Sequence, residues 1–211
     1  MLISNRYAGT APAAGVDIEP NFPTQEISNV SFVDCVASGN SGPGFAFYIA
    51  HFTATTAPFS LRLVNYSVTS GRHYGIAIDY IAPGIRGEIE VSNCSVSDTQ
   101  FGALAIIDKA AGDSIVRVHG GTFDASASIE QAQAPVHITT AAISVIGDSK
   151  FAVGGVILEG IAVRDNRSRP WLVSASRPGT NVQNVSGGGI QVHNPHGCTE
   201  SGPLHLGARC V

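Results

Sequence analysis

Apolar and polar residues alternate in short runs along most of this chain, and a glycine often opens the run. Four such runs are GVDIE at Gly15, GFAFY at Gly44, GIAID at Gly75 and GALAI at Gly102. Strict alternation over a few residues predicts a β-strand with one buried face. Since almost no stretch shows a helical period, the pattern predicts an all-β fold.

Longer stretches around these runs repeat one another. Those that begin at Val33, Val64, Ser92 and Glu159 align, and a fifth from His119 aligns on either side of an insertion rich in Ala and Gln. The opening glycines are 29, 31 and 27 residues apart, a spacing that suits one coil of a solenoid. Because one coil cannot bury its apolar face alone, we predict a right-handed parallel β-helix of about seven coils, with three strands per coil.

A β-sandwich of hairpins is the alternative fold, since it also has many short strands. Hairpin turns favour Asn-Gly or Asp-Gly, and the chain contains neither dipeptide. A length of 211 residues requires only one core. We therefore predict a β-helix domain over residues 1–194 and a capping segment over residues 195–211. The incomplete first coil of this domain suggests either a truncated solenoid or a removed N-terminal segment.

The coil steps resemble those of a known family. They are VNYSVT at Val64, SNCSVS at Ser92, the Gly-Ile-x-Ile strand at Gly75 and GVDIEPN at Gly15. They are similar to the right-handed β-helix repeats of pectate lyases, polygalacturonases, alginate lyases and mannuronan epimerases, a resemblance that runs to about Asn194. It implies a polysaccharide as the partner. The Asp-Asp and Gly-His-Gly, Arg-x-Pro-x-x-Arg and Asp-Pro-His-Glu signatures of these enzymes are absent, so no catalytic residue carries over.

Stacking of coils in register places equivalent residues in columns about 4.8 Å apart. In the third strand of each coil, the residues between the apolar ones face solvent. This predicts two outward columns: Asp17, Ala46, Ala77, Leu104 and, beside it, Glu19, Tyr48, Asp79, Ile106. The acids and the tyrosine then line a shallow trough whose floor is kept low by alanines.

The trough suggests three kinds of chemistry. Arg72 and His73 precede the Asp79 strand and are expected to overhang the same trough, so the candidate catalytic residues are Asp17, Glu19, Tyr48, Arg72, His73 and Asp79. Two carboxylates about 9 Å apart can act as acid and base in glycoside hydrolysis. A carboxylate with Tyr, His and Arg can abstract a proton from a uronate, and acids can hold Ca²⁺. Alternatively, outward acids only keep the surface soluble.

Charged residues and histidines outside the trough form three further groups. Arg164, Arg167 and Arg169 lie close to Trp171 and can grip a sugar carboxylate beside an aromatic platform; the alternative is a charged loop. A column of alternating sign predicts a surface ion-pair ladder of small energetic value: Arg62, Glu90 and Arg117. His137 and His193 have no metal-ligand spacing to a partner, so no metal site is assigned.

The cysteines divide into two pairs. Cys35 and Cys94 share a column with Tyr66 between them, so they lie two coils apart, too far for a disulfide, and are expected to be buried thiols. Cys198 and Cys210 fall in the capping segment, where either a disulfide or two free thiols fit the sequence.

Composition narrows the function. Charged residues make up 13% of the chain, the net charge is −4 and there are only two lysines, so a nucleic-acid partner is not expected. No apolar run is long enough to cross a bilayer. We expect a secreted or periplasmic protein, without its signal peptide in this chain, that acts on a polysaccharide as a lyase, hydrolase or epimerase, with Ca²⁺ as a candidate cofactor. The alternative is a non-catalytic β-helix: an adhesin, a spike segment or a carbohydrate-binding scaffold.

Overall fold

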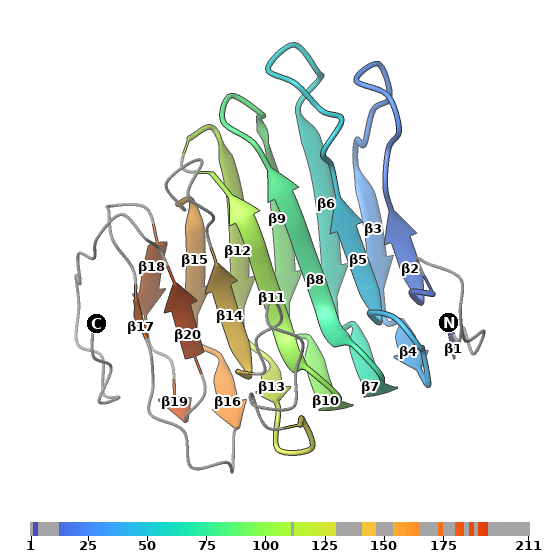
Figure 1. The fold of residues 1–211 in the computed structure, drawn as a ribbon, viewed down its shortest axis with the longest axis vertical. Helices are drawn as coiled ribbons and strands as arrows, with labels where there is room; N and C mark the ends of the chain where they lie inside the picture. Colours follow the sequence, from blue (N-terminus) through green and yellow to red (C-terminus); the bar gives the residue numbers. More distant parts are fainter. Residues whose placement is uncertain are drawn as a thin grey trace.

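The chain winds into a parallel β-solenoid in which each coil contributes one strand to each of three sheets (Figure 1). The computed structural model describes residues 2–3, 13–110, 112–129, 141–146 and 154–164, together with the backbone of the strands between 173 and 193. Every strand pairing in these residues is parallel. The predicted parallel solenoid with three strands per coil is therefore confirmed.

Each sheet is built from every third strand. Sheet A contains β1 (Leu2–Ile3), β4 (Val36–Ser38), β7 (Ser67–Gly71), β10 (Ser95–Thr99), β13 (Thr122–Asp124), β16 (Ala162–Arg164) and β19 (Ser186–Gly187). Sheet B contains β2 (Val16–Ile18), β5 (Phe45–Tyr48), β8 (Tyr74–Ile81), β11 (Gly102–Lys109), β14 (Ile143–Ile146), β20 (Ile190–His193) and β17 (Val173–Ser174). Sheet C contains β3 (Val30–Val33), β6 (Phe59–Val64), β9 (Gly87–Ser92), β12 (Ser114–His119), β15 (Val156–Glu159) and β18 (Thr180–Gln183).

The central coils follow one another without interruption. From β4 to β15 the strands enter sheets A, B and C in turn, which makes four complete coils. One described strand leaves this order: β17 pairs with β20 and lies outside it, while β20 pairs with β14. None of the described residues forms a helix that is long and apolar enough to cross a membrane.

A continuous apolar interior holds the coils together. Alternate residues of each strand point inward and stack on their counterparts in the next coil, as Leu61, Ile89, Val116 and Val156 do in sheet C. All four are fully buried. Burial of an aliphatic side chain of this size stabilises a fold by about 1.5 to 3 kcal/mol, so the stacked rows are the main source of stability.

Left-handed residues form the corner columns of the solenoid. One column joins the ends of the sheet C strands to sheet A and contains Asp34, Asn65, Asn93, Gly120 and Gly160, all with positive φ. Asn and Gly tolerate this conformation better than other residues. The Asn65 amide donates to Asp34 Oδ1 at 2.9 Å, so the column is also bonded along the axis.

The cysteine prediction is confirmed for the first pair. Cys35 and Cys94 are buried free thiols, and Tyr66 lies between them in register. The Tyr66 hydroxyl donates to the Gly44 carbonyl at 3.1 Å, which satisfies the polar end of a fully buried ring. Cys198 and Cys210 lie outside the described residues, so the choice between a disulfide and free thiols stays a prediction, as does the division at residue 194.

The register of sheet B corrects one part of the sequence alignment. Gly102 pairs with Tyr74 rather than with Gly75, so Leu104 lies beside Ile76 and Ile106 beside Ile78. Leu104 and Ile106 are fully buried in the core, not in the outward columns where the glycine alignment placed them. The glycine of this coil stands one residue earlier than in the preceding coils, because the inward apolar side chains set the register.

Lysine 109 lies in the interior. It is the last residue of β11, in register with Ile81, and is fully buried. Its ammonium donates to the carbonyls of Ala110 and Gly154, the latter at 2.8 Å. Burial lowers the pKa of Lys109 to about 8. Its charge therefore faces the core rather than the outer surface of sheet B.

Candidate functional site

The outer face of sheet B carries the predicted row of acids. Asp17 pairs with Ala46, Ala46 with Ala77, and Ala77 with Ala105, so alanines form the floor over three coils. Asp17 and Glu19 lie on the coil that precedes Ala46, and both are exposed. Burial and the neighbouring Glu19 carboxylate raise the pKa of Asp17.

Tyr48 and Asp79 are direct neighbours on this face. They pair across β5 and β8, so their side chains project side by side. The pKa of Tyr48 is raised by burial, then by the Asp79 and Glu19 carboxylates. The structure thus brings together three residues that the sequence placed in one column: Glu19, Tyr48 and Asp79.

A second aspartate lies next to Asp79. Asp79 pairs with Ile107 of the next coil, so Asp108 follows one residue further along, opposite Tyr80. Burial and, as a smaller cause, the nearby Asp108 carboxylate together raise the pKa of Asp79 to about 6, against a backbone hydrogen bond at Tyr80 that lowers it. Asp79 therefore keeps its proton to a higher pH than an ordinary aspartate does.

Backbone conformation contributes to this arrangement. Tyr80 and Asp108 both have positive φ, at 57° and 50°, and they occupy equivalent places at the ends of β8 and β11. Non-glycine residues pay a conformational cost in this region. The Tyr80 ring lies 6.1 Å from the Tyr48 ring, so two phenols stand beside the Asp79–Asp108 pair.

Sequence reasoning missed Asp108. The glycine alignment put Ile106 in line with Asp79, which hid the aspartate two residues further on. Matching the alternating apolar residues instead, Ile76 and Ile78 with Leu104 and Ile106, gives the observed register and places Asp108 beside Asp79. That signal was present in the sequence.

Arg72 and His73 lie at the opposite end of β8 from Asp79. They precede Tyr74, the first residue of the strand, whereas Asp79 is its sixth residue. Six residues of extended chain between His73 and Asp79 span roughly 20 Å. The structure therefore does not bring Arg72 or His73 to the acids. His73 instead packs edge-on against Tyr74 and Phe101, with ring centroids 5.1 and 5.2 Å away.

The predicted substrate-binding group of three arginines and a tryptophan is only partly described. Arg164 is the last residue of β16 in sheet A, and its side chain is exposed. Arg167, Arg169 and Trp171 lie outside the described residues, as does His137, and only the backbone of His193 is described. Because Arg164 belongs to sheet A and Asp79 to sheet B, the two residues lie on different faces of the solenoid.

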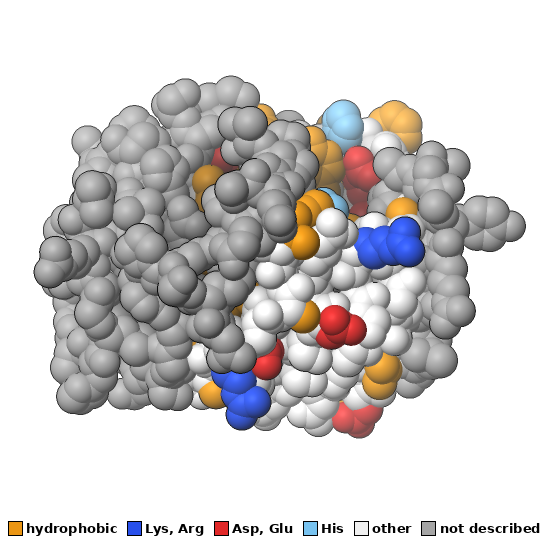
Figure 2. Space-filling view, turned by 60° about the horizontal axis from the view of Figure 1, so that its bottom comes forward, with side chains coloured by type: hydrophobic (Ala, Val, Ile, Leu, Met, Phe, Trp, Pro, Cys, Tyr) orange, Lys and Arg blue, Asp and Glu red, His pale blue; other side chains and the backbone are white. Residues whose placement is uncertain are grey.

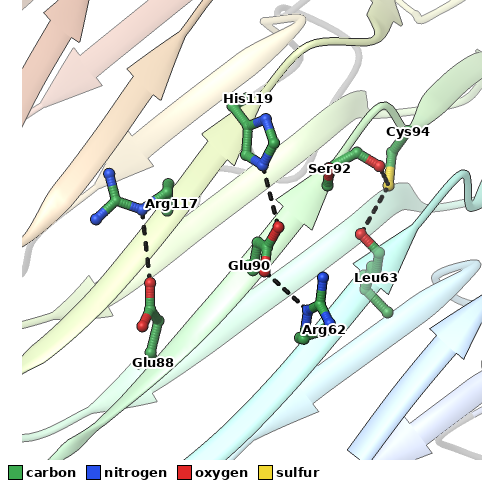
Figure 3. Close-up of polar contacts among 8 residues, drawn as sticks. All are labelled: Arg62, Leu63, Glu88, Glu90, Ser92, Cys94, Arg117 and His119. Atoms are coloured by element: carbon green, nitrogen blue, oxygen red, sulfur yellow. Dashed lines mark hydrogen bonds and ion pairs between the residues drawn. The ribbon is translucent and has the colours of Figure 1, made fainter.

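The outer face of sheet C has a paired arrangement of charges (Figure 3). Glu90 accepts from Arg62 Nε at 2.8 Å and contacts His119 Nε2 at 3.1 Å, so one carboxylate is bound from both neighbouring coils. Arg117 lies 3.5 Å from Glu88. Hydrogen bonds from His119 and Arg62, the former the larger cause, lower the pKa of Glu90. The predicted column of Arg62, Glu90 and Arg117 is confirmed in register and for the Arg62–Glu90 pair, whereas Arg117 pairs with Glu88 instead of Glu90.

The outer face of sheet A is mainly uncharged. Figure 2 brings this side forward, and on its described part acidic and basic side chains are few beside the uncharged ones. Hydroxyl groups bond between coils, Ser67 with Ser95 at 2.8 Å and Thr69 with Ser38 at 3.1 Å. Ser70 donates to Asp98 at 2.7 Å. The polar groups of this face are therefore satisfied by one another.

Metal-ligating side chains do not gather in the part of the chain that the structure describes: no three His, Cys, Asp or Glu residues there are placed to hold one ion. Comparison of the chain with protein-family models, with curated proteins and with solved structures finds no match. The fold and the two aspartates therefore carry the functional argument by themselves.

Proposed function

We propose that this protein is a carbohydrate-active enzyme that hydrolyses a glycosidic bond at the Asp79–Asp108 pair. One observation carries the proposal: a half-buried aspartate whose pKa is raised to about 6 lies beside a second aspartate on an accessible row of polar side chains. Perturbed carboxyl pairs of this kind are typical of acid–base catalysis. Structural acids on the same solenoid, such as Glu90, are paired with cations instead.

The two aspartates have different roles in the proposal. Asp79 holds the proton and donates it to the oxygen of the leaving sugar, because its surroundings disfavour the charged form. Asp108 acts as the base or nucleophile, which either activates water or attacks the anomeric carbon. Water supplies the hydroxyl that ends on the anomeric carbon and the hydrogen that replaces the proton of Asp79. Tyr48, Tyr80 and Glu19 line the approach and orient the sugar.

A neutral polysaccharide suits the row better than a polyuronate. The acids Asp17, Glu19, Asp79 and Asp108 project from one face, and a carboxylated polymer would be repelled by them. Proton abstraction from a uronate needs a cation near the sugar carboxylate. Arg72 is at the far end of β8 and Lys109 faces the core. Hydrolysis is therefore favoured over lyase or epimerase chemistry, and a secreted or periplasmic location suits a polymeric substrate.

The finer class of the fold is part of the same proposal. We propose a right-handed winding of about seven coils, similar to the pectate-lyase-like β-helix family. Support for the winding comes from the general rule that a crossover between parallel strands of one sheet is right-handed. Support for the family is the resemblance of the coil steps alone.

A non-catalytic sugar-binding scaffold is the second candidate. The observation that favours it is the uncharged outer face of sheet A, where hydroxyl groups recur in register from coil to coil. Such a face offers many hydrogen-bonding groups to a regular polymer without any group that transfers a proton. In this case removal of Asp79 would leave polymer binding unchanged.

The test is turnover of a glycan panel by the parent chain and by matched variants. The panel contains xylan and β-glucans as neutral polymers and pectate and alginate as acidic ones, with reducing ends and unsaturated uronates as readouts. We expect Asp79→Asn and Asp108→Asn to lower kcat/KM at least 100-fold, in the range reported for general acid–base groups, and Tyr48→Phe to lower it by a similar or smaller factor.

Exposed acids on other parts of the solenoid provide the controls, Glu26→Gln and Asp113→Asn, which we expect to keep full activity. Activity of the parent chain should fall about tenfold per pH unit above about pH 6, since Asp79 must be protonated to act as the acid. Unchanged turnover in both aspartate variants, or no product from any polymer, would refute the assignment.

A further inference from the structure

The two strands that carry the aspartates share an irregular end. In β8 and β11 the core residues alternate with outward ones as far as Ile78 and Ile106. The next two residues of each strand are both partly exposed, and the third is buried again. One residue per strand therefore stands outside the alternation. It is Tyr80 in β8 and Asp108 in β11, both with positive φ. We call these two positions the bends.

The bend in β11 is what brings Asp108 to the outer face. In a regular strand the residue after an outward one points into the core. This happens at the end of β5, where Ile49 follows Tyr48 and is fully buried. At the bend the left-handed backbone lets Ile107 and Asp108 both face outward. Since this conformation is unfavourable for a residue other than glycine, its surroundings must hold it.

The residue after each bend anchors the chain to the core. Ile81 does so in β8 through its apolar side chain. Lys109 takes the same place in β11, and its ammonium donates to the carbonyls of Ala110 and Gly154, the latter at 2.8 Å. The Gly154 N–H in turn donates to the Lys109 carbonyl at 3.2 Å, and the Ala110 N–H donates to the Ile81 carbonyl at 2.8 Å. Lys109 thus joins the end of β11 to the turn before β15 through both its backbone and its side chain.

The space around the Lys109 ammonium is closely fitted. Gly155 has a φ of 69°, and a Cβ at this position would lie 2.8 Å from Lys109 Nζ and 2.4 Å from the Ser114 carbonyl oxygen. A buried ammonium is tolerated only where its donors are satisfied. The two carbonyls therefore fix where the Lys109 side chain ends, which an apolar residue such as Ile81 cannot do through hydrogen bonds.

We infer that Lys109 is a positioning residue of the proposed active site: it acts through Asp108, by holding the bend that keeps this carboxyl group beside Asp79. The inference rests on the proposed function for its effect on turnover. Lys109 is fully buried, so it does not touch the substrate. Its charge is not a cause of the raised pKa of Asp79, which burial and Asp108 raise against a backbone hydrogen bond at Tyr80.

Lys109→Met tests the inference, because methionine fills a similar volume but cannot donate to either carbonyl. If Lys109 positions Asp108, its loss should release the bend, move the second acid away and lower the pKa of Asp79 by about half a unit. If Lys109 acted only as a nearby cation, its loss would raise this pKa instead. Carboxyl chemical shifts followed by NMR titration distinguish the two. A raised or unchanged pKa of Asp79 would overturn the inference.

Turnover provides the second readout. On a glycan that the parent chain cleaves, Lys109→Met should lower kcat/KM at least tenfold, mainly through kcat, because a displaced catalytic group slows the reaction more than binding. A lowered pKa of Asp79 with unchanged kcat would refute the proposed role of Asp108 and not the positioning by Lys109. No product from any glycan would refute the proposed function, while the titration still decides the inference.

Two further variants make the test specific. Val118→Ala is the control for lost stability, since Val118 is fully buried in β12 of sheet C. We expect it to unfold at lower urea concentration and to leave the titration of Asp79 and the turnover unchanged. Should Lys109→Met fail to fold, Lys109→Ile copies the residue that the preceding coil has at this place. Loss of folding in both variants would make Lys109 a residue of the core alone and overturn the inference.

Discussion

Glu90 on sheet C lies between Arg62 and His119, whereas Asp79 on sheet B lies beside Asp108. The scaffold is the same on both faces, since each acid projects outward from the second of three stacked strands. The pKa shifts are nevertheless opposite: neighbouring cations lower that of Glu90, and burial with a second acid raises that of Asp79. A carboxyl group whose pKa is raised beside a second acid is therefore a better candidate for function than one that is held ionised by ion pairs.

Removal of the Asp79 charge should have the largest effect on stability. The folded-state pKa of about 6 exceeds the unfolded value of 3.8, so the folded state binds more protons between these pH values and stability falls as pH rises through that window. Asp79→Asn should therefore raise the free energy of unfolding by about 2 kcal/mol at pH 7 to 8 and change it little at pH 3. Urea unfolding at several pH values measures this. Equal loss of stability at both pH values would contradict it.

A charge exchange between the two faces should alter both pKa values. Tyr48→Arg places a cation in register with Asp79 and should lower its pKa by about one unit, while Arg62→Tyr removes a cation from Glu90 and should raise its pKa by a smaller amount. Carboxyl chemical shifts followed by NMR titration report each value. If neither titration moves, the neighbouring coil does not determine these pKa values and the contrast between the faces has another origin.

The ion pairs of sheet C should have the smallest effect. The pKa of Glu90 is lowered in the folded state, so its contribution is present above the unfolded value of 4.5 and is lost as pH falls below it. Glu90→Gln should cost about 0.5 to 1 kcal/mol at pH 7 and low salt, and less at high salt, because partly exposed pairs are screened. Thermal unfolding of the parent chain and of Glu90→Gln at two salt concentrations measures this cost. A cost that does not depend on salt would indicate a packing role instead.

The sequence predicted the architecture because the solenoid is built from local signals. Alternation in the runs at Gly44 and Gly75 indicated strands, and the spacing of 29, 31 and 27 residues between the opening glycines indicated coils. The same signals placed Glu19, Tyr48 and Asp79 in one column, and the pairing of Tyr48 with Asp79 agrees.

The rest of the site depends on features that a repeat alignment does not contain. Gly102 suggested a register one residue away from the real one, because a glycine marks a corner only loosely while buried side chains must interdigitate. Arg72 and His73 are close to Asp79 in sequence but a whole strand separates them in space. Ala105 packs in a cluster with Tyr74 of the preceding coil, a contact that no single repeat reveals.

The corner columns also determine how such a protein can diversify. Arg117 and Ile157 remain in register although they are 40 positions apart in the sequence, whereas Arg62 and Glu90 are only 28 apart. Extra residues are therefore accommodated between strands without displacing the rows on either side, provided that Gly120 and Gly160 keep the left-handed turn. Evolution can lengthen or exchange one connection at a time and so remodel the surroundings of Asp79 and Asp108 while the two aspartates stay in place.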